Sequence, residues 1–414
     1  LDCSPSAAPT LDDLARRIRA AAAAGRARSW LRGAGFDDAF VAERRPPDRS
    51  LLDAVSPTRP IVVHHAAGTV AYCNTLALRL LGVDPSRDDG TRGVERDAAG
   101  SATGTVEKHT GVLEGVPYLA GADLARAWDA LASDLVAMGV TAVTDATVAN
   151  GPDELAVLAA LGERTPGPAV GAMVGAAALT APAFADAALH ELRVRHAKIV
   201  VESDEPEDLD ALVAGARRYR LGAAVHVTDI DGLDRALHAL GAAGTAAAGA
   251  GDRLEHVSLC LPEQVGQIAA AGVGVVTQPA FMAERREKYA ELLSDVEQEW
   301  LYRLGSLLAA GVAVAASSDS PVVQASPLAS MAAAMVSLNP GERVDAAVAL
   351  RLVTCAAAAA SGLPGGVLTP GAPGDLVVLG ADPLACGPAE LVEIPVLATV
   401  IGGRVVHAAA ELGW

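Results

Sequence analysis

Six polar side chains fall within or just after short apolar runs of this sequence, and their types are those that bind metals or move protons. They are Asp145, Lys198, His226, His256, Gln278 and Asp319. Two neutral imidazoles together with a carboxylate suit Zn²⁺ or a similar divalent ion. Such an ion lowers the pKa of a bound water to about 7, and a neighbouring carboxylate can then act as general base.

Most of these residues also have a structural interpretation, which we keep beside the chemical one. Asp145 can cap the turn that follows it, and His226 can be a hydrogen-bonded core histidine. His256 can pair with its neighbour Glu255, and Asp319, in the stretch SSDSP, can form an Asx turn before a proline. Taken together, however, they would bring a lysine, two histidines and an aspartate to one end of a sheet.

Lys198 stands in an apolar strand pattern, VRHAKIVV, where an ammonium group is costly to bury. It is one of only three lysines in the chain. Burial lowers the pKa of a lysine and frees a neutral amine, which could form a Schiff base with a carbonyl substrate, as in a lyase or aldolase. It could instead react with CO₂ to give a metal-binding carbamate, which the two histidines favour. The third interpretation is a side chain that extends from the strand end into solvent.

The composition excludes several classes of partner. The 414-residue chain has a formal net charge of −18, and 51% of its residues are hydrophobic. A sizeable core is expected, and acidic charge without basic runs argues against nucleic acid and anionic membranes. No apolar run reaches membrane-spanning length. The five cysteines form no CxxC spacing, which argues against a disulfide framework or thiolate zinc site and favours a reduced cytoplasm.

Short apolar or β-branched runs alternate with helical patterns through the middle of the chain. This alternation predicts βα units around a parallel sheet. Two of the intervening segments, 206–219 and 262–271, begin with proline near an acidic residue, as helices often do. The seven predicted strands are residues 141–146, 169–174, 194–201, 223–227, 253–257, 273–278 and 312–317.

Seven strands are one short of a TIM (β/α)₈ barrel, in which catalytic residues lie at the carboxyl ends of the strands. We predict such an α/β barrel over residues 1–364, without its first strand and with a cap or insertion at about residues 50–125. The gap should then lie between the first and last predicted strands and expose both edges. Residues 365–414 predict short strands joined by Gly and Pro turns, which would form a small, partial β-sandwich.

In this order, the stretches HAKIVV, AAVHVTD, RLEHVSL and AASSDSPV resemble four strands of the amidohydrolase superfamily. Further stretches, among them VHHAAGTVAYCNTLAL, GVTAVTDAT and LTPGAPGDLVVLGADPL, are similar to its amidohydrolase-3 branch, which includes N-substituted formamide deformylases. The resemblance extends over nearly the whole chain. It implies a metal-dependent hydrolase on a TIM barrel, joined to a small β-sandwich built from both chain ends.

Residue by residue, the resemblance implies that Lys198 is a carboxylated bridging ligand and that His226 and His256 bind metal. It also implies that Asp319 binds metal and acts as the acid and base. The family opens with half of the sandwich and then a first barrel strand that carries a His-x-His metal motif, and this motif does not occur here. We therefore expect that a strand preceding residue 1 would supply the remaining ligands.

These observations predict a cytoplasmic amidohydrolase that uses one or two divalent ions, most readily zinc, to cleave a non-peptide carbon–nitrogen bond of a small molecule. The alternatives are a Schiff-base lyase acting through Lys198 and a catalytically inert scaffold. We expect no nucleic-acid or membrane partner and leave a homodimer open. Substrate contacts are predicted, with buried structural roles equally open, for His64, His65, Asn74, Gln278 and Tyr289.

Overall fold

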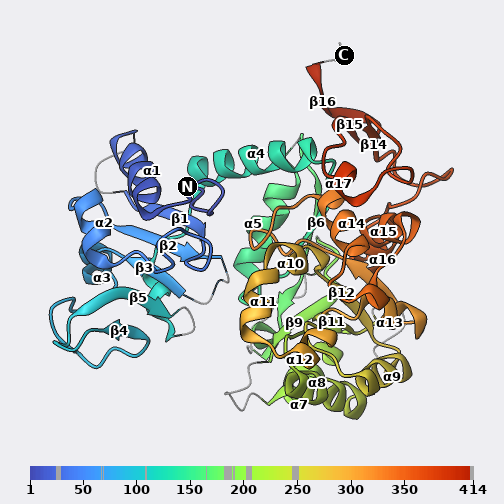
Figure 1. Ribbon diagram of the computed structural model, residues 1–414, viewed down its shortest axis with the longest axis horizontal. Helices are drawn as coiled ribbons and strands as arrows, with labels where there is room; N and C mark the ends of the chain where they lie inside the picture. The colour runs from blue at the N-terminus through green and yellow to red at the C-terminus, as the bar shows by residue number, and fades with distance from the viewer. Residues whose placement is uncertain are drawn as a thin grey trace. The chain divides into compact units, whose positions relative to one another are not determined.

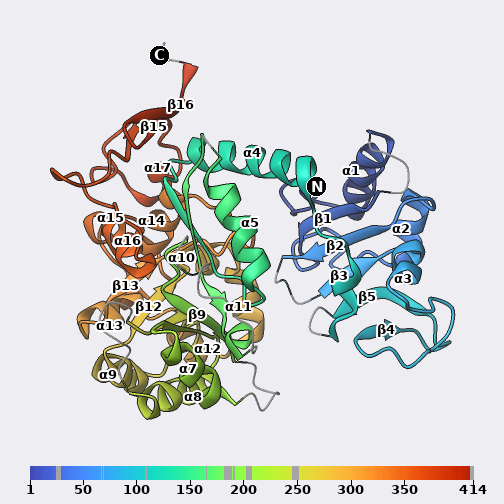
Figure 2. The same cartoon turned by 180° about the vertical axis from the view of Figure 1, so that it is seen from behind.

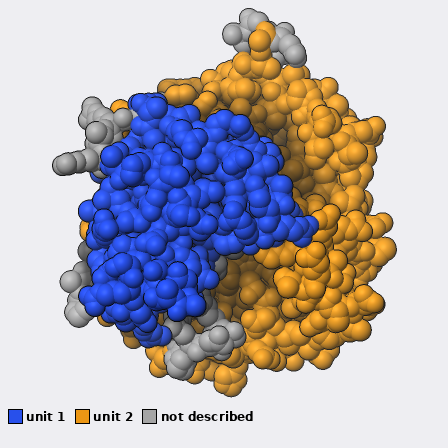
Figure 3. Space-filling view, turned by 60° about the vertical axis from the view of Figure 1, so that its left-hand side comes forward, with its two compact units in different colours: residues 1–120, 320–324 blue, residues 121–319, 325–414 orange. Residues whose placement is uncertain are grey.

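The structure is a computed structural model that describes residues 1–24, 29–66, 68, 70–107, 110–164, 166–180, 189, 192–201, 208–244 and 251–410. It divides into two compact units, blue and orange in Figure 3. Unit 1 comprises Leu1–Ala120 with Ser320–Gln324, and unit 2 comprises Gly121–Asp319 with Ala325–Trp414. None of the described helices is both long and apolar enough to cross a bilayer.

A five-stranded sheet forms the centre of unit 1 (Figure 1), with the order β1-β2-β3-β5-β4. β1 and β2 run parallel, and the other pairs are antiparallel. Because side chains alternate between the faces of a strand, Ile61 and Val63 enter one hydrophobic core and Val62 enters another. The elements are α1 (Leu11–Ala24), β1 (Leu31–Phe36), α2 (Arg49–Val55), β2 (Ile61–His65), β3 (Val70–Cys73), α3 (Thr75–Leu80), β4 (Val94–Arg96), β5 (Ala102–Glu107) and η2 (Val112–Gly115).

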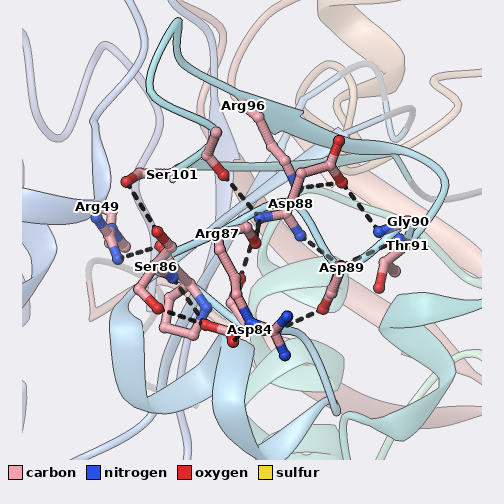
Figure 4. A network of polar contacts seen from close by, with 12 residues as sticks. Arg49, Asp84, Ser86, Arg87, Asp88, Asp89, Gly90, Thr91, Arg96 and Ser101 are labelled. Atoms are coloured by element: carbon pink, nitrogen blue, oxygen red, sulfur yellow. Dashed lines mark hydrogen bonds and ion pairs between the residues drawn. The ribbon is translucent and has the colours of Figure 1, made fainter.

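The segment from residue 84 to residue 101 is organised around the side chain of Arg96 (Figure 4). Its guanidinium donates hydrogen bonds to the carbonyls of Asp84 at 3.0 Å, Gly100 at 3.1 Å and Arg87, and it pairs with the Asp89 carboxylate at 2.6 Å. The carbonyls and carboxylates of this loop therefore surround a cation that the chain itself supplies. The Arg96 side chain is only 9% exposed, so this network stabilises the loop from within.

Unit 2 contains all seven predicted strands, and they pair in parallel in chain order. β6 pairs with β7, and after Met173 the chain continues as β8, the first strand of a six-stranded sheet that ends at β13. Among the described residues, β6 pairs only with β7 and β13 only with β12. The strands are β6 (Ala142–Asp145), β7 (Ala169–Ala172), β8 (Val174–Gly175), β9 (His196–Val200), β10 (Gly222–Val227), β11 (Arg253–His256), β12 (Gly274–Thr277) and β13 (Val314–Ala316).

The two faces of this parallel sheet carry different side chains. Ala197 and Ile199 of β9, like Val225 of β10, belong to the large hydrophobic core of unit 2. Lys198 and His226 have the opposite parity on the same strands and point to the other face. Helices α7, α8 and α9 lie along the outer side of the sheet in Figures 1 and 2, so the polar residues gather on the side away from these helices.

Helix α7, predicted over residues 206–219, occupies Leu209–Arg218, and residues 206 and 207 lie outside the described part of the chain. Asp208 and Asp229 accept hydrogen bonds from the first turns of α7 and α8, and α9 spans the predicted residues 262–271. The helices are α4 (Gly121–Ala137), α5 (Pro152–Gly162), η3 (Ala176–Thr180), α7 (Leu209–Arg218), α8 (Ile230–Ala242), α9 (Pro262–Ala271), α10 (Pro279–Glu284), α11 (Arg286–Leu292), α12 (Asp295–Glu299), α13 (Leu304–Ala309), α14 (Pro327–Met335), η4 (Pro340–Glu342), α15 (Ala346–Val353) and α16 (Cys355–Ser361).

A three-stranded antiparallel sheet follows α16, in the region predicted to contain short strands. It consists of β14 (Leu376–Leu379), β15 (Val396–Ile401) and β16 (Arg404–Ala408), with the short helix α17 (Pro388–Leu391) between β14 and β15 in the chain. Helix α4 packs against β15 and β16. The buried Thr399 hydroxyl donates a hydrogen bond to the Val136 carbonyl of α4 at 2.6 Å, which fastens this sheet to the rest of unit 2.

Candidate metal and catalytic site

The four residues predicted to form the site lie on or just after strands of the parallel sheet. Lys198 is in β9, His226 is next to last in β10, and His256 ends β11. Asp319 follows the end of β13 by three residues. Because parallel strands have their carboxyl ends at the same edge of a sheet, the topology brings these strand ends together.

The imidazoles of His226 and His256 are in contact, with ring centroids 4.3 Å apart and ring planes at 70°. Burial lowers the pKa of His226 to about 3, and repulsion from His256 and Lys198 adds to this shift. Burial also lowers the pKa of His256. Both rings are therefore neutral at pH 7 and offer lone pairs, which is the form of histidine that binds metal.

The backbone at His256 adopts an unfavourable conformation at the end of β11. His256 has a φ of 69° and Val257 a φ of 51°, and the Val257 amide donates to the Glu255 carbonyl at 3.0 Å. Asp319 also has a positive φ, 55°. Left-handed backbone is costly for residues other than glycine, most of all for β-branched valine, and such residues are concentrated at functional sites.

The neighbouring strand β12 and helix α10 hold His256 through its ring and its backbone. Nδ1 of the ring lies 2.7 Å from Gln278 Oε1, and the Thr277 hydroxyl donates to the His256 carbonyl at 3.0 Å. The Phe281 ring stacks on the imidazole with centroids 6.2 Å apart. The substrate contact predicted for Gln278 would require its buried amide to leave these partners.

Lys198 is buried, with 6% of its surface exposed. Among the residues that the structure describes, its amine has no ion pair or hydrogen bond. Burial lowers the pKa of Lys198, although the carboxylates of Glu255 and Asp319 act in the opposite direction. A neutral amine, or a modified form of it, is therefore favoured over a buried, unpaired ammonium, and a side chain extended into solvent does not fit this burial.

Asp319 is the most exposed of the four residues. The protein around the carboxyl nevertheless displaces water and raises the pKa of Asp319, while His256 and Lys198 partly oppose that shift. Once deprotonated, a carboxyl with a raised pKa is a stronger base than an ordinary aspartate. Asp319 therefore combines access from solvent with the basicity that proton transfer requires.

Glu255 is a buried carboxylate that the sequence analysis did not select as a site residue. Its charge acts on Lys198, His256 and Asp319. It accepts a hydrogen bond from Arg253 Nε at 2.5 Å, so its ion pair is with Arg253, and the suggested local pair with His256 does not form. Strand alternation could have predicted this ion pair, because Arg253 and Glu255 are two positions apart on β11 and therefore face the same side.

Two other predicted residues have structural roles in their own loops. Asp145 accepts hydrogen bonds from the Thr147 amide at 2.9 Å and from the Asn150 side chain at 2.7 Å, which caps the turn after β6. Asn74 is fully buried at the start of α3. Its side-chain amide makes four hydrogen bonds to main-chain groups, which use both donors and both lone pairs of its oxygen.

Tyr289, on α11, is the outer member of a chain of three hydroxyl groups. Its hydroxyl lies 3.1 Å from that of Tyr302, which accepts a hydrogen bond from Ser258 at 3.2 Å. The two tyrosine rings meet edge to face at 6.1 Å, and Phe281 meets Tyr302 in the same way at 6.5 Å. Since Phe281 also stacks on His256, Tyr289 belongs to an aromatic wall that begins at a site histidine.

His65 belongs to a separate polar cluster in unit 1, which the sequence analysis did not anticipate. Its Nε2 lies 3.6 Å from Asp37 Oδ1 and 3.2 Å from Asp38 Oδ1. In the described part of the chain, this is the one group of three such residues whose ligand atoms all lie within 4.8 Å of one another. These donors suit either an internal ion pair or a divalent cation. His64, beside His65 on β2, is half-buried.

The donor types at the parallel sheet fit a divalent metal ion. Two neutral imidazoles in contact and a basic carboxylate are the nitrogen and oxygen ligands that zinc prefers, and Lys198 could add oxygens if it were carboxylated. Two ligands of one zinc ion lie at most about 4.4 Å apart, since each bond is about 2.2 Å or shorter. The ligand atoms of His226, His256 and Asp319 do not all meet within 4.8 Å in the described structure. For an ion at this end of the sheet, the imidazole pair would supply two ligands, and Asp319 would have to approach the pair to share the ion.

Comparison with known protein families gives one match over nearly the entire chain. The family model described as "Amidohydrolase family" matches residues 1–407. The N-substituted formamide deformylase of Arthrobacter pascens is 28% identical over 97% of this chain and 83% of its own length. The putative amidohydrolase YtcJ of Bacillus subtilis is 24% identical over 91% of this chain and 80% of its own length.

Solved structures show the same fold at low sequence identity. An uncharacterized metal-dependent hydrolase from Pyrococcus horikoshii superimposes with a TM-score of 0.70, at 22% identity over 94% of this chain and 83% of its own. A second, from Pyrococcus furiosus, gives 0.68 at 24% identity over 92% of this chain and 83% of its own. The parallel α/β architecture of unit 2 is therefore that of known hydrolase structures, and a closing strand between β6 and β13 is not among the described residues.

Proposed function

Because the chain belongs to the amidohydrolase family, we propose that it is a metal-dependent hydrolase acting on a non-peptide carbon–nitrogen bond of a small molecule. The bond proposed is an amide or N-acyl group, which the name of the deformylase relative supports. The observation that carries the proposal is the contact of two neutral imidazoles at the ends of β10 and β11, with ring centroids 4.3 Å apart.

His226 and His256 would hold the ion, and zinc is the metal that best suits neutral imidazoles combined with a carboxylate. An ion bound there would lower the pKa of a water and polarise the substrate carbonyl. The lowered pKa values of the two histidines support this assignment, because neither ring has to lose a proton before it binds.

We further propose that Lys198 acts as a carboxylated ligand. Its neutral amine would attack CO₂, form a nitrogen–carbon bond and release one proton to solvent, which yields a carbamate whose single negative charge is shared by two oxygens. The burial of Lys198 and the lowered pKa of its amine support this step. Because the charges of Glu255 and Asp319 act on this position, a new anion would be unfavourable without a compensating cation. Carboxylation and metal binding should therefore depend on each other.

Asp319 is proposed to move the proton during hydrolysis. It would accept a proton from the attacking water as the oxygen bonds to the carbonyl carbon. It would then deliver this proton to the departing nitrogen as the carbon–nitrogen bond breaks. Its exposure and raised pKa support this role. We also propose that Asp319 is a metal ligand, which requires its carboxylate to move closer to the imidazoles of His226 and His256.

The substrate contacts predicted for His64, His65, Gln278 and Tyr289 stay proposals, although His65 and Gln278 have partners within the protein. Tyr289 presents a hydroxyl at the outer end of the hydroxyl chain, beside the aromatic wall that includes Phe281. This placement would suit a donor to a substrate carbonyl. His64, on β2 of unit 1, is a further proposed contact. The fully used amide of Asn74 assigns that residue to the structure of unit 1 instead.

Metal analysis combined with a screen of amide and N-acyl substrates tests this function. The protein should be purified with zinc, cobalt or manganese and bicarbonate present, and its metal content measured before and after dialysis. His65→Asn is the matched control, because it removes an imidazole from the separate cluster in unit 1. Metal that survives in His65→Asn and is lost in His226→Asn supports the proposed position. If the protein binds no divalent ion under these conditions, the hydrolase proposal fails and an inert scaffold takes its place.

A Schiff-base lyase is the second candidate function, because Lys198 is buried and unpaired within the described residues. Such an enzyme would form an imine between the lysine amine and a carbonyl substrate. Borohydride would reduce that imine to a stable adduct on Lys198, which mass spectrometry detects. A carbamate gives no such adduct, so this treatment with a panel of carbonyl compounds separates the two functions.

A further inference from the structure

Gln278 connects three neighbouring strands of the parallel sheet through one side chain. It follows the end of β12 and is 2% exposed. On one side, its Oε1 lies 2.7 Å from Nδ1 of His256, the last residue of β11. On the other side, its Nε2 donates to the Ser317 hydroxyl, just after β13, at 2.9 Å. The amide thus lies between a predicted metal ligand and the segment that leads to Asp319.

The orientation of this amide is set by a main-chain group. Nε2 also lies 3.4 Å from the carbonyl oxygen of Val276, which can only accept a hydrogen bond. If the oxygen and nitrogen were exchanged, two oxygens without hydrogens would face each other at this distance. The serine hydroxyl can donate or accept and does not discriminate. The carbonyl of Val276 therefore keeps the nitrogen on its own side and the oxygen toward His256.

An amide oxygen accepts hydrogen bonds only, so the ring nitrogen that faces it must carry the proton. We propose that Gln278 is a positioning residue that fixes His256 as its Nδ1–H tautomer and leaves Nε2 as the nitrogen able to bind a metal. The identity of the ligand as a metal rests on the proposed function, whereas the tautomer rests on the hydrogen bond alone. A partner on the second nitrogen is how proteins commonly orient metal-binding histidines.

Other contacts hold the His256 imidazole in the orientation that allows its hydrogen bond to Gln278. Phe281 stacks on the ring, and Thr277 holds the backbone carbonyl of His256. A ring flipped by 180° would place a carbon against the amide oxygen and lose the 2.7 Å hydrogen bond. The tautomer is therefore a property of the metal-free protein, in place before any ion arrives.

The first test is made on the metal-free protein by nitrogen NMR of histidine-labelled samples, with His256 assigned from the spectrum of His256→Asn. We expect an Nδ1–H, Nε2-unprotonated signature in the unmodified protein. Gln278→Glu keeps an acceptor oxygen and should retain it. Gln278→Met keeps the shape without the acceptor and should lose the preference. Gln264→Met is the matched control, since Gln264 is an equally buried glutamine that caps α9.

The second test measures zinc affinity by competition with a chelating dye. Gln278→Met should weaken binding by about 10- to 100-fold, and Gln278→Glu and Gln264→Met should stay close to the unmodified protein. An Nε2–H signature in the unmodified protein, or equal tautomer ratios in Gln278→Glu and Gln278→Met, would overturn the proposal. If the unmodified protein binds no zinc while the Nδ1–H signature is present, the proposed function fails and the positioning of His256 by Gln278 stands.

Discussion

The rings of His226 and His256 meet edge to face at 4.3 Å although thirty positions separate the two residues in the chain. The parallel pairing of β10 and β11 explains this contact, because His226 is in register with Glu255 and His256 is the next residue. The left-handed turn at His256 then alters the alternation of the strand. Strand register and one strained residue together produce the imidazole pair.

Loss of one imidazole should abolish tight metal binding. His226→Asn removes one of the two neutral nitrogen ligands, and we expect zinc affinity to fall on the order of 100-fold or more. This loss should exceed the one caused by changing a residue that only hydrogen-bonds to a ligand. Isothermal titration with zinc measures this effect. His65→Asn should bind as the unmodified protein does. Zinc affinity that falls in His65→Asn and is unchanged in His226→Asn would show that the cluster with Asp37 and Asp38 holds the ion.

Asp319→Asn should keep the metal and lose turnover. The amide has nearly the volume of the carboxylate but cannot take up the proton, so kcat should fall by about 10²- to 10⁴-fold. Metal content and kcat, measured on the same sample, decide the point. In the unmodified enzyme, kcat/KM should fall as the pH is lowered through the raised pKa of Asp319, and this acid limb should be missing from residual activity of the variant. A variant that loses metal as well would make Asp319 chiefly a ligand.

Lys198→Ala should lose metal and activity together. Without the amine no carbamate forms, and the two histidines remain as the only strong ligands of the position. The unmodified protein refolded without bicarbonate should show the same loss, and bicarbonate should restore binding. Lys288→Ala is a control that removes a lysine from α11, outside the parallel strands. The carbamate proposal would be contradicted if bicarbonate restored metal binding in Lys198→Ala. It would also be contradicted if the unmodified protein bound metal fully after refolding without bicarbonate.

The metal-free protein should lose stability as the pH falls from about 6.5 toward 4. Burial lowers the pKa of His196 to about 4 and of His226 to about 3, whereas both titrate near 6.5 in an unfolded chain. In this window the unfolded chain binds more protons than the folded one, so acid favours unfolding. Each such proton contributes about 1.4 kcal/mol per pH unit to the slope. Urea denaturation at several pH values measures how the free energy of unfolding changes with pH. His226→Asn should reduce this slope by the contribution of one proton, about 1.4 kcal/mol per pH unit.

Removal of the central cation from the loop of residues 84–101 should destabilise unit 1. Arg96→Met keeps the aliphatic part of the side chain but leaves several carbonyls without their donor, at a cost of about 1–3 kcal/mol. Arg126→Met is the control, because its ion pair with Asp123 is exposed and contributes little. Denaturation followed by the tyrosine and tryptophan signals compares the two. Equal effects would mean that the network in Figure 4 adds nothing to stability.

The sequence alone determined where the parallel strands lie and which polar residues face away from the core. All seven predicted strands occur in unit 2, and Lys198 and His226 have the opposite parity to the core residues of their strands. Both results follow from period-two alternation, which depends only on positions along one strand. The same local rule explains why α9 was predicted over its full range from Pro262 onward.

Partners across strands were decided by the tertiary structure. From the sequence, Gln278 could be either a substrate contact or a buried structural residue, and a local pair of Glu255 with His256 was one interpretation. The structure pairs Gln278 with His256 and Glu255 with Arg253. Unit 1 likewise joins Leu1–Ala120 to Ser320–Gln324, a segment far along the chain. A residue's face is set by its own strand, but its partner depends on register, on side-chain conformation and on segments far away in the chain. Local sequence patterns do not contain this information about contacts between strands.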